Sequence, residues 1–199
     1  MTGLVMAGGR GSRMATAAEK LTLGHLRPVV LGVVGALSGC GAILEVVAAV
    51  SPHAPRTRSL LEGRVRLLET PGSGYSADLA CALDMLEGPV LVVPGDLPLL
   101  DSGMVCRVAG MYDAASWITL LVSEEYAGSL GSSPGTRVRC DGQSCRYAGI
   151  SVVDARSAGA VPQRNVIVND PRIAINTNTI QDWMVLLGGA HDPPEYLCL

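Results

Sequence analysis

The length, composition and charge of this chain exclude several classes of protein. With 199 residues it has the size of one ordinary domain, and we expect a single domain over residues 1–199. Hydrophobic residues make up 48% and charged residues 17%, which argues against a disordered chain. The net charge of −3 provides no basic surface for nucleic acid.

The start of the chain favours a strand over a targeting segment. No basic stretch precedes the apolar residues of Met1–Met6, and a glycine-rich loop follows them at once. The longest apolar run, Val29–Leu37, is interrupted by glycine and is too short to span a bilayer. We therefore expect a soluble, cytoplasmic protein without a membrane span.

Short apolar runs and helical stretches alternate along the chain. The runs are rich in Val, Ile and Leu and are bounded by Gly, Pro, Ser or Asp, which is typical of buried strands. Strands are predicted at Leu4–Met6, Ile43–Val50, Val65–Leu68, Val90–Val93, Trp117–Val122, Ile150–Val153 and Arg172–Ile175. Helices are predicted at Pro28–Leu37, Arg56–Leu61, Ser76–Leu86, Ser102–Ala114 and Thr177–Leu187. This alternation indicates an α/β protein with a Rossmann-like three-layer α/β/α fold and a mainly parallel mixed sheet.

One segment, Ser123–Cys145, breaks this alternation. It is rich in glycine, serine and charge, and its end, Cys140–Cys145, is typical of a hairpin turn. We expect an excursion that flanks the functional site. Buried thiols are the preferred interpretation of the six cysteines, although a bridge between Cys140 and Cys145 stays open. Because no two cysteines form a C-x-x-C pair, a zinc site is not expected.

The first predicted strand runs into a glycine-rich loop, A-G-G-R-G-S-R at residues 7–13. Glycines let the backbone approach a ligand, and successive free N–H groups form an anion cradle. Arg10 or Arg13 can add bidentate contacts to phosphate oxygens. The loop is not a Walker A loop, because a Ser-Arg pair follows its last glycine, and it lacks the third glycine of a dinucleotide fingerprint. It therefore predicts a phosphate site of another kind.

Two charged residues add to this prediction. Lys20 is the only lysine in a chain with 14 arginines, and a compact ammonium that can move with a changing phosphate is a reason to keep lysine there. Asp96 follows the predicted strand Val90–Val93, at the end where parallel sheets bind ligands, and its carboxylate could hold Mg²⁺ against phosphates.

The loop and the lysine together resemble a known signature. The motif L-x-M-A-G-G-x-G-S-R-M followed by Glu19-Lys20-Leu21 is similar to that of the sugar-1-phosphate and cofactor guanylyl- and cytidylyltransferases. The resemblance implies that the loop wraps a nucleoside triphosphate and that Lys20 lies on the phosphates. It also implies that Asp96 binds Mg²⁺ and that Asn176, in an I-N-T segment, completes the metal site; a helix cap is the alternative for Asn176. The family usually has proline where this chain has Leu21.

Three further stretches are similar to the archaeal-type GTP:adenosylcobinamide-phosphate guanylyltransferases: Ser51–Thr57, Glu69–Tyr75 and Ala148–Val153. The resemblance covers most of the chain and is weakest over Ser123–Cys145 and the C-terminal end. It implies transfer of GMP from GTP to adenosylcobinamide phosphate, which gives adenosylcobinamide-GDP and pyrophosphate in cobalamin biosynthesis. Because the chain has no Walker A motif for a kinase step, the acceptor must arrive phosphorylated.

The resemblance also implies roles for single residues. The expected catalytic residues are Arg13, Lys20 and Asp96. The expected GTP site consists of Ala7, Gly8, Gly9, Gly11, Ser12, Arg13, Lys20, Glu69, Gly74 and Asp96. A carboxylate can accept the N1–H and N2–H₂ groups of guanine together, so Glu69 is the candidate for reading the base and Asp78 the second choice. The three histidines are not expected to act as a base, because an anionic acceptor needs none.

Two other functions stay open. A molybdenum-cofactor guanylyltransferase would share the loop and GTP, and only the stretches at 51–57 and 69–75 argue against it. A regulatory protein of the same fold that has lost catalysis is the other alternative, and the presence of Arg13, Lys20 and Asp96 argues against it. The corrinoid-binding residues cannot be read from the sequence, and a homodimer stays open.

Overall fold

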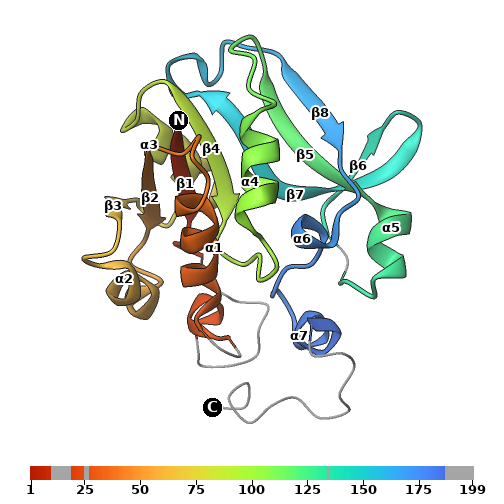
Figure 1. Cartoon of the computed structure of the whole chain (residues 1–199), viewed down its shortest axis with the longest axis horizontal. Helices are drawn as coiled ribbons and strands as arrows, with labels where there is room; N and C mark the ends of the chain where they lie inside the picture. Colours follow the sequence, from red (N-terminus) through yellow and green to blue (C-terminus); the bar gives the residue numbers. More distant parts are fainter. Residues whose placement is uncertain (10–18, 25–26, 134, 187–199) are drawn as a thin grey trace.

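The computed structural model describes residues 1–9, 19–24, 27–133 and 135–186. These residues form one eight-stranded sheet with the order β3-β2-β1-β4-β7-β5-β8, and β6 pairs with β7 beside this path (Figure 1). The strands are β1 (Thr2–Met6), β2 (Glu45–Val50), β3 (Arg66–Glu69), β4 (Pro89–Pro94), β5 (Trp117–Ser123), β6 (Arg137–Cys140), β7 (Gln143–Asp154) and β8 (Gln163–Ile167).

The sheet is mixed, and most of its neighbouring strands are parallel. Strand β1 pairs in parallel with β2 and β4, β2 with β3, and β5 with β8. The long strand β7 is antiparallel to β4, β5 and β6, so it joins the two parallel parts of the sheet. The predicted α/β fold with a mainly parallel mixed sheet is confirmed.

Helices cover the two faces of the sheet. On one face, α1 (Val29–Ser38) and α4 (Ser102–Ala109) pack against strand residues such as Val5 and Val93, and both helices lie in front of the sheet in Figure 1. On the other face, α3 (Tyr75–Asp84) packs against Leu4, Val92 and their neighbours. Successive residues of a strand point to opposite faces, so continuous apolar runs are what a sheet buried on both faces requires.

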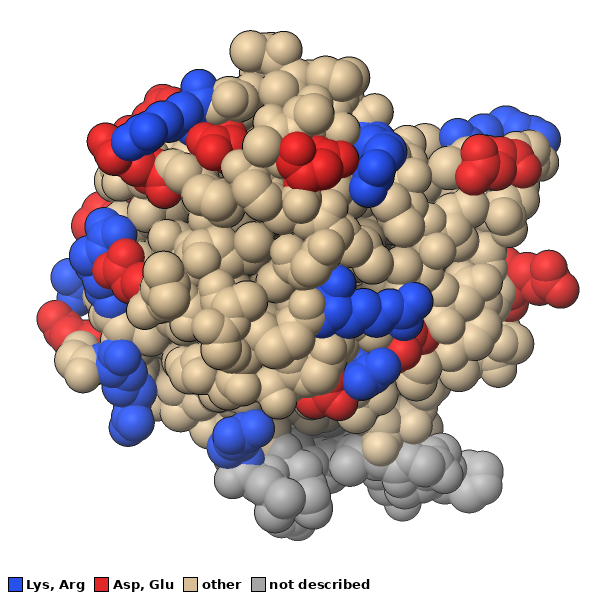
Figure 2. Space-filling model, turned by 45° about the horizontal axis from the view of Figure 1, so that its top comes forward, with Lys and Arg blue, Asp and Glu red and all other residues tan. Residues whose placement is uncertain are grey.

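Shorter helices complete the described part of the chain. They are α2 (Pro55–Leu61), α5 (Glu124–Ser129), α6 (Pro171–Ala174) and α7 (Ile180–Leu186), with 3₁₀ turns at η1 (Lys20–Thr22) and η2 (Ala155–Ser157). None of the described helices is long and apolar enough to cross a membrane. On the face in Figure 2, acidic and basic side chains lie next to one another around a largely uncharged area.

Several predicted elements differ from the structure. The strand expected at Arg172–Ile175 is the short helix α6, because Asp170 caps its first turn and Pro171 stands at its first position, where proline favours a helix. The helix expected at Ser102–Ala114 ends at Ala109, before Gly110. The polar strands β6 and β8 were not expected.

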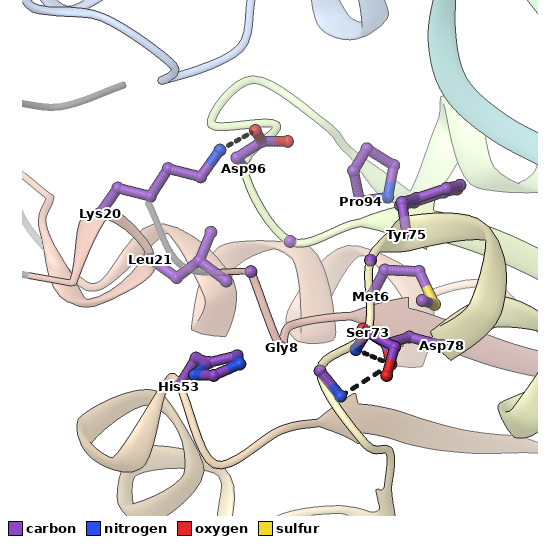
Figure 3. A pocket seen from close by; sticks show the side chains of 14 residues that line it. Met6, Gly8, Lys20, Leu21, His53, Ser73, Tyr75, Asp78, Pro94 and Asp96 are labelled. Atoms are coloured by element: carbon purple, nitrogen blue, oxygen red, sulfur yellow. Dashed lines mark hydrogen bonds and ion pairs between the residues drawn. The ribbon is translucent and has the colours of Figure 1, made fainter. Parts of the chain in front are cut away.

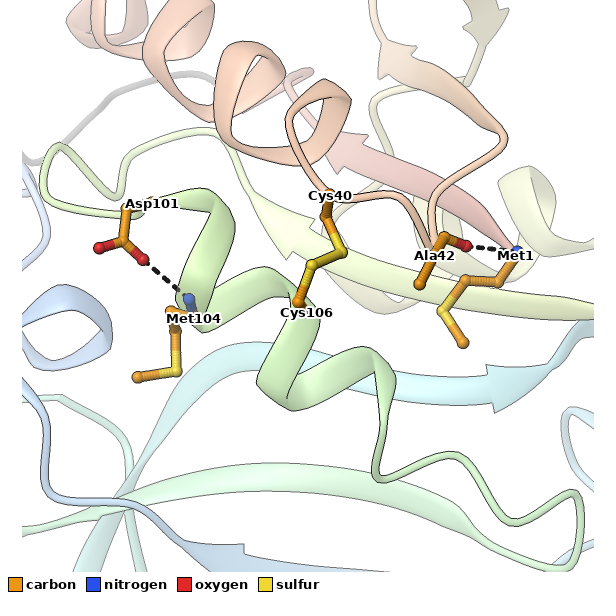
Figure 4. The surroundings of a disulfide bond; sticks show 6 residues. All are labelled: Met1, Cys40, Ala42, Asp101, Met104 and Cys106. Carbon is orange, nitrogen blue, oxygen red and sulfur yellow. Dashed lines mark hydrogen bonds between the residues drawn. A yellow bond between two sulfur atoms is a disulfide. The ribbon is translucent and has the colours of Figure 1, made fainter.

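The cysteines also differ from the prediction. Cys40, at the end of α1, and Cys106, in α4, form a disulfide with a Cα–Cα distance of 5.5 Å (Figure 4). The prediction of buried thiols is therefore wrong for this pair, because 66 residues separate two cysteines that helix packing brings together. Cys140 and Cys145 are free thiols. The hairpin between them is confirmed: Asp141 and Gly142 both have positive φ, as this type of two-residue turn requires.

Candidate active site

The carboxyl ends of β1 and β4 meet where the chain reverses its direction across the sheet. From β1 the chain adds β2 and β3 on one side, and it then returns to add β4 on the other side. Open α/β sheets bind ligands at such a switch point. A cavity of about 560 Å³ lies here, and its lining includes Gly8, Gly9, Lys20, Leu21, His53, Gly72, Ser73, Gly74, Tyr75, Asp78, Gly95 and Asp96 (Figure 3).

Lys20 lies at the centre of a polar contact at the edge of this cavity. Its Nζ donates hydrogen bonds to Oδ2 of Asp96 at 2.6 Å and to Oδ1 of Asn178 at 2.5 Å. The side chains of Lys20 and Asp96 are 17% and 11% exposed, so the ion pair is largely shielded from water. Segments from three distant parts of the chain therefore meet at one cation.

The segment that bears Lys20 is anchored by the residue before it. The carboxylate of Glu19 accepts hydrogen bonds from the backbone N–H groups of Arg56 and Thr57 at 2.8 and 2.7 Å, and from the hydroxyl of Thr57 at 2.7 Å. These N–H groups belong to the first turn of α2, where helices leave backbone donors unpaired. Glu19 thus fixes the start of η1 and, with it, the position of Lys20. The prediction from sequence missed this role.

Asparagine oxygens lie close to Asp96. The backbone N–H of Thr177 donates to the carbonyl of Asp96 at 3.1 Å, which holds the loop after β4 against residues 176–178. Oδ1 of Asn176 is buried and accepts no hydrogen bond from any described residue. A carboxylate and two amide oxygens are the hard oxygen donors that Mg²⁺ prefers. The residues present therefore fit this ion, although no group of three or more His, Cys, Asp or Glu forms a metal cluster within the described ranges.

Glycines bring the backbone close to the cavity at two loops. A Cβ on Gly8 would lie 3.0 Å from the backbone N of Ser51, whose hydroxyl donates to the carbonyl of Gly8 at 2.6 Å. Gly9 has no heavy atom within 4 Å of such a Cβ and faces open space. Gly72 and Gly74 have φ angles of 72° and 115°, which favour glycine.

Asp78 shapes the second of these loops. Its side chain is buried, and Oδ1 accepts hydrogen bonds from the backbone N–H groups of Gly72 at 2.9 Å and Ser73 at 3.2 Å. Glu69, the first choice for reading guanine, is not among the residues that line the cavity. It lies on the exposed side of β3 and pairs with Arg58 at 3.1 Å. The structure therefore brings Asp78, and not Glu69, to the cavity.

The remaining predicted residues fall into three groups. Gly8, Gly9, Lys20, Gly74 and Asp96 line the cavity, and Ala7 is buried. Asn176 lines a neighbouring cavity. The predicted contacts of Gly11, Ser12 and Arg13 fall outside the described residues. The sequence did not single out Asn178, although the repeated N-T of the I-N-T-N-T run was a signal that could have indicated it.

The neighbouring cavity has a volume of about 780 Å³ and shares Tyr75, Pro94 and Asp96 with the first. Tyr75 stands at the start of α3, and its hydroxyl donates to the carbonyl of Gly149 in β7 at 3.3 Å. Desolvation and the carboxylate of Asp96 raise the pKa of Tyr75 to about 12. The hydroxyl therefore stays protonated and can serve as a donor at the boundary between the two cavities.

A buried polar network supports residues 176–178. Arg146 of β7 donates to the carbonyls of Ser133 and Ala174 and to the hydroxyl of Ser132 at 2.5 to 2.8 Å. Asp182 is fully buried and accepts from the N–H and hydroxyl groups of both Ser133 and Thr179 at 2.9 Å. The segment that carries both asparagines is thereby tied to β7 and to the loop after α5.

Comparison with known families shows to which protein family the chain belongs. Residues 3–140 match the family described as the MobA-like NTP transferase domain. The chain belongs to this family. It is therefore a nucleotidyltransferase by family, which fits a pair of glycines, a lysine and an aspartate around one cavity. The match includes β1 to β6 and ends before the residues around Asn176 and Asn178.

Individual relatives agree with the family. The adenosylcobinamide-phosphate guanylyltransferase of Methanocaldococcus jannaschii is 26% identical over 196 residues, 92% of this chain and 93% of that protein. The bifunctional protein GlmU of Kineococcus radiotolerans is 35% identical over 123 residues, but this chain covers only 24% of its length. Among solved structures, a nucleotidyl transferase from Methanothermobacter thermautotroptrophicus has a TM-score of 0.70 at 19% identity, with 93% of this chain and 94% of that chain covered. A CMP:2-keto-3-deoxy-manno-octonic acid synthetase complexed with CTP has a TM-score of 0.64 at 13% identity, with 94% and 97% covered.

Proposed function

We propose that this protein transfers GMP from GTP to adenosylcobinamide phosphate in cobalamin biosynthesis. The observation that carries the proposal is the similarity of nearly the whole chain to a relative of that name, in a chain that places Lys20 and Asp96 together at the switch point. The family alone supports nucleotidyl transfer, and the relative adds the nucleotide and the acceptor.

In this reaction an oxygen of the acceptor phosphate forms a bond to the α-phosphorus of GTP. The bond between that phosphorus and the bridging oxygen to the β-phosphate breaks, and pyrophosphate leaves. The attacking oxygen is already anionic, so no side chain has to remove a proton. Catalysis is then a matter of positioning and of stabilising charge.

The contacts around Lys20 suggest a role for each residue of the site in this reaction. Its ammonium would exchange Asp96 and Asn178 for phosphate oxygens and follow the negative charge onto the departing pyrophosphate. Asp96, Asn178 and Asn176 would hold Mg²⁺, which neutralises phosphate charge when bound. Gly8 and Gly9 would offer backbone N–H groups to the triphosphate.

The base would lie at the other loop of the cavity. Oδ1 of Asp78 already accepts hydrogen bonds from two backbone N–H groups. Its proposed role is therefore to fix the conformation of the Gly72–Gly74 turn, beside which guanine would bind. Calorimetric titration with GTP, ATP, CTP and UTP tests this choice, and we expect GTP to bind much better than the other three. Equal affinity for ATP and GTP would contradict guanylyl transfer and leave the fold untouched.

A single-turnover assay tests the whole reaction. GTP labelled at the α-phosphate is mixed with excess protein, Mg²⁺ and adenosylcobinamide phosphate, and adenosylcobinamide-GDP is followed by chromatography. We expect one labelled product and stoichiometric pyrophosphate, and Asp96→Asn provides the inactive control. Labelled GTP that stays intact with an intact, folded protein would overturn the proposal.

A second candidate is GMP transfer to molybdopterin, which the description of the family favours. The same assay with molybdopterin as the acceptor separates the two candidates. We expect no labelled product from it. A binding protein without catalysis would give no product with either acceptor, although it would retain its affinity for GTP.

A further inference from the structure

The second cavity is built from strand faces. In β5, Ile118, Leu120 and Val122 pack into the core under α1 and α4, so Trp117 and Thr119 point to the opposite face of the sheet. In β7, Ser151 lies on that same opposite face, between core residues on either side. Thr119 and Ser151 are only 6% and 7% exposed. Polar residues at two paired, buried positions between apolar neighbours indicate a surface that contacts something other than core.

The cover of this face includes Val153 at the end of β7, but not Thr119 of β5 or Ser151 of β7. Helix α3 buries the part of the face formed by β1, β2 and β4, where Leu79, Ala82 and Leu83 pack against the strands. The cavity of about 780 Å³ begins where this packing ends, between α3 and the strands β5, β7 and β8. It continues into the nucleotide cavity, because Tyr75, Pro94 and Asp96 line both. A molecule in the second cavity would therefore meet the first at Asp96.

The lining shows what kind of molecule fits. Among the described residues that line it, Asp84 and Asp96 carry negative charge, and no lysine, arginine or histidine is present. Aromatic rings are supplied by Tyr75, Trp117 and Tyr147. Hydroxyl and amide groups, such as Thr119 and Gln163, supply neutral hydrogen-bonding partners. Such a lining favours a body with rings and neutral polar groups and disfavours one with negative charge.

We propose that this cavity holds the body of the acceptor, and that this body is partly apolar and carries no negative charge apart from the one phosphate that reaches the Asp96 edge. The inference rests on the proposed nucleotidyl transfer for the reaction, and it adds the place and the chemical class of the acceptor. The Lys20 side of the first cavity would take the charge of the triphosphate, whereas the described residues that line the second cavity include no cation for further anionic groups.

Steady-state kinetics with a matched pair of variants test the assignment. Tyr147 and Met85 are both 43% exposed, but only Tyr147 lines the cavity. Tyr147→Ala is expected to raise the KM for adenosylcobinamide phosphate about tenfold and to leave the KM for GTP unchanged. Tyr147→Phe keeps the ring and should restore a nearly normal acceptor KM, and Met85→Ala should change neither constant.

The outcomes separate this inference from the proposed function. If wild-type protein uses adenosylcobinamide phosphate and Tyr147→Ala leaves the acceptor KM unchanged, the cavity assignment is overturned and the function stands. If the protein uses the multiply anionic molybdopterin instead, both the proposed acceptor and the inferred class are overturned. If Tyr147→Ala raises the KM for GTP as much as that for the acceptor, Tyr147 supports the whole site and the inference is likewise overturned.

Discussion

The two cavities meet at Asp96, but they are built in different ways. The first is formed by loops at the carboxyl ends of β1, β3 and β4, where glycines and one lysine face the space. The second lies between α3 and the faces of β5 and β7, with aromatic and neutral polar side chains. One cavity offers backbone groups and charge, and the lining that the structure describes for the other contains no cation.

This difference explains why one cavity is visible in the sequence and the other is not. A triphosphate needs close backbone approach and positive charge, and only a few residue types supply them. Thr119 and Ser151 are ordinary strand residues until the sheet shows which face they share. Variants on the nucleotide side should therefore lower kcat, and variants on the acceptor side should change the acceptor KM.

The largest effect is expected at Asp96, where the two cavities meet. Asp96→Asn removes the only carboxylate near Lys20 among the described lining residues and should lower kcat by about a thousandfold or more, since it removes the charge of the proposed metal ligand. Pyrophosphate release in the presence of Mg²⁺ measures this loss. Asp141→Asn, in the exposed hairpin turn, is the matched control and should leave kcat unchanged. Near-normal turnover of Asp96→Asn would make Asp96 a structural residue.

Lys20 should give the next largest effect, confined to the nucleotide side. Lys20→Ala should lower kcat by about a hundredfold and GTP affinity by less, because charge on the leaving pyrophosphate grows in the transition state. Lys20→Arg should also be impaired, since a planar guanidinium cannot replace a compact ammonium between Asp96 and Asn178. Steady-state kinetics and calorimetry separate the two constants. Arg66→Ala, an exposed basic residue in β3, is the control.

A wild-type kcat in Lys20→Ala would show that the lysine only neutralises Asp96. The glycine loops alone would then distinguish the first cavity from the second as a site for phosphate. A loss of GTP affinity as large as the loss of kcat would show that Lys20 binds the ground state and the transition state equally.

The parts of the fold that could be predicted are those that local chemistry determines. The run Val90–Val93 is apolar on both faces and ends at Gly95-Asp96, so the strand and the position of the carboxylate both followed from the sequence. The edge strand β8 is half polar, with the sequence Q-R-N-V-I, and gave no such pattern. The disulfide between Cys40 and Cys106 depends on the packing of α1 against α4, which no spacing encodes.

In the candidate site, the sequence predicted suitable residue types better than it predicted where their side chains point. The sequence predicted Asn176 as a metal ligand, and the structure adds Asn178, whose side chain contacts Lys20. Glu69 was expected to bind the guanine base, but the alternation of side chains along β3 directs it outward, where it pairs with Arg58. In both cases the residue type was plausible, and its direction depended on one or two positions along a backbone. Asp78 was named second for its charge, and its buried hydrogen bonds became visible only in the folded chain.

A third prediction concerns the buried network of Arg146. Arg146→Met leaves the carbonyls of Ser133 and Ala174 without their buried donor and should lower the free energy of unfolding by about 2 kcal/mol. Urea denaturation measures this change, and Arg139→Met, in the exposed hairpin, is the control. Unchanged stability would show that the network is replaceable and does not hold residues 176–178.

The smallest effect is expected at the floor of the second cavity. Thr119→Val keeps the shape of the side chain and removes its hydroxyl, which accepts a hydrogen bond from Nε2 of Gln163 at 3.3 Å. Gln163 also donates to Asn165, so its amide keeps a partner and the fold should tolerate the change. We expect a rise of about threefold in the acceptor KM, which corresponds to one neutral hydrogen bond, and no change in kcat or in the KM for GTP. Initial rates at saturating GTP with varied acceptor measure it. A fall in kcat at constant acceptor KM would place Thr119 among the residues that act on the transition state, and the division of labour between the two cavities would then be incorrect.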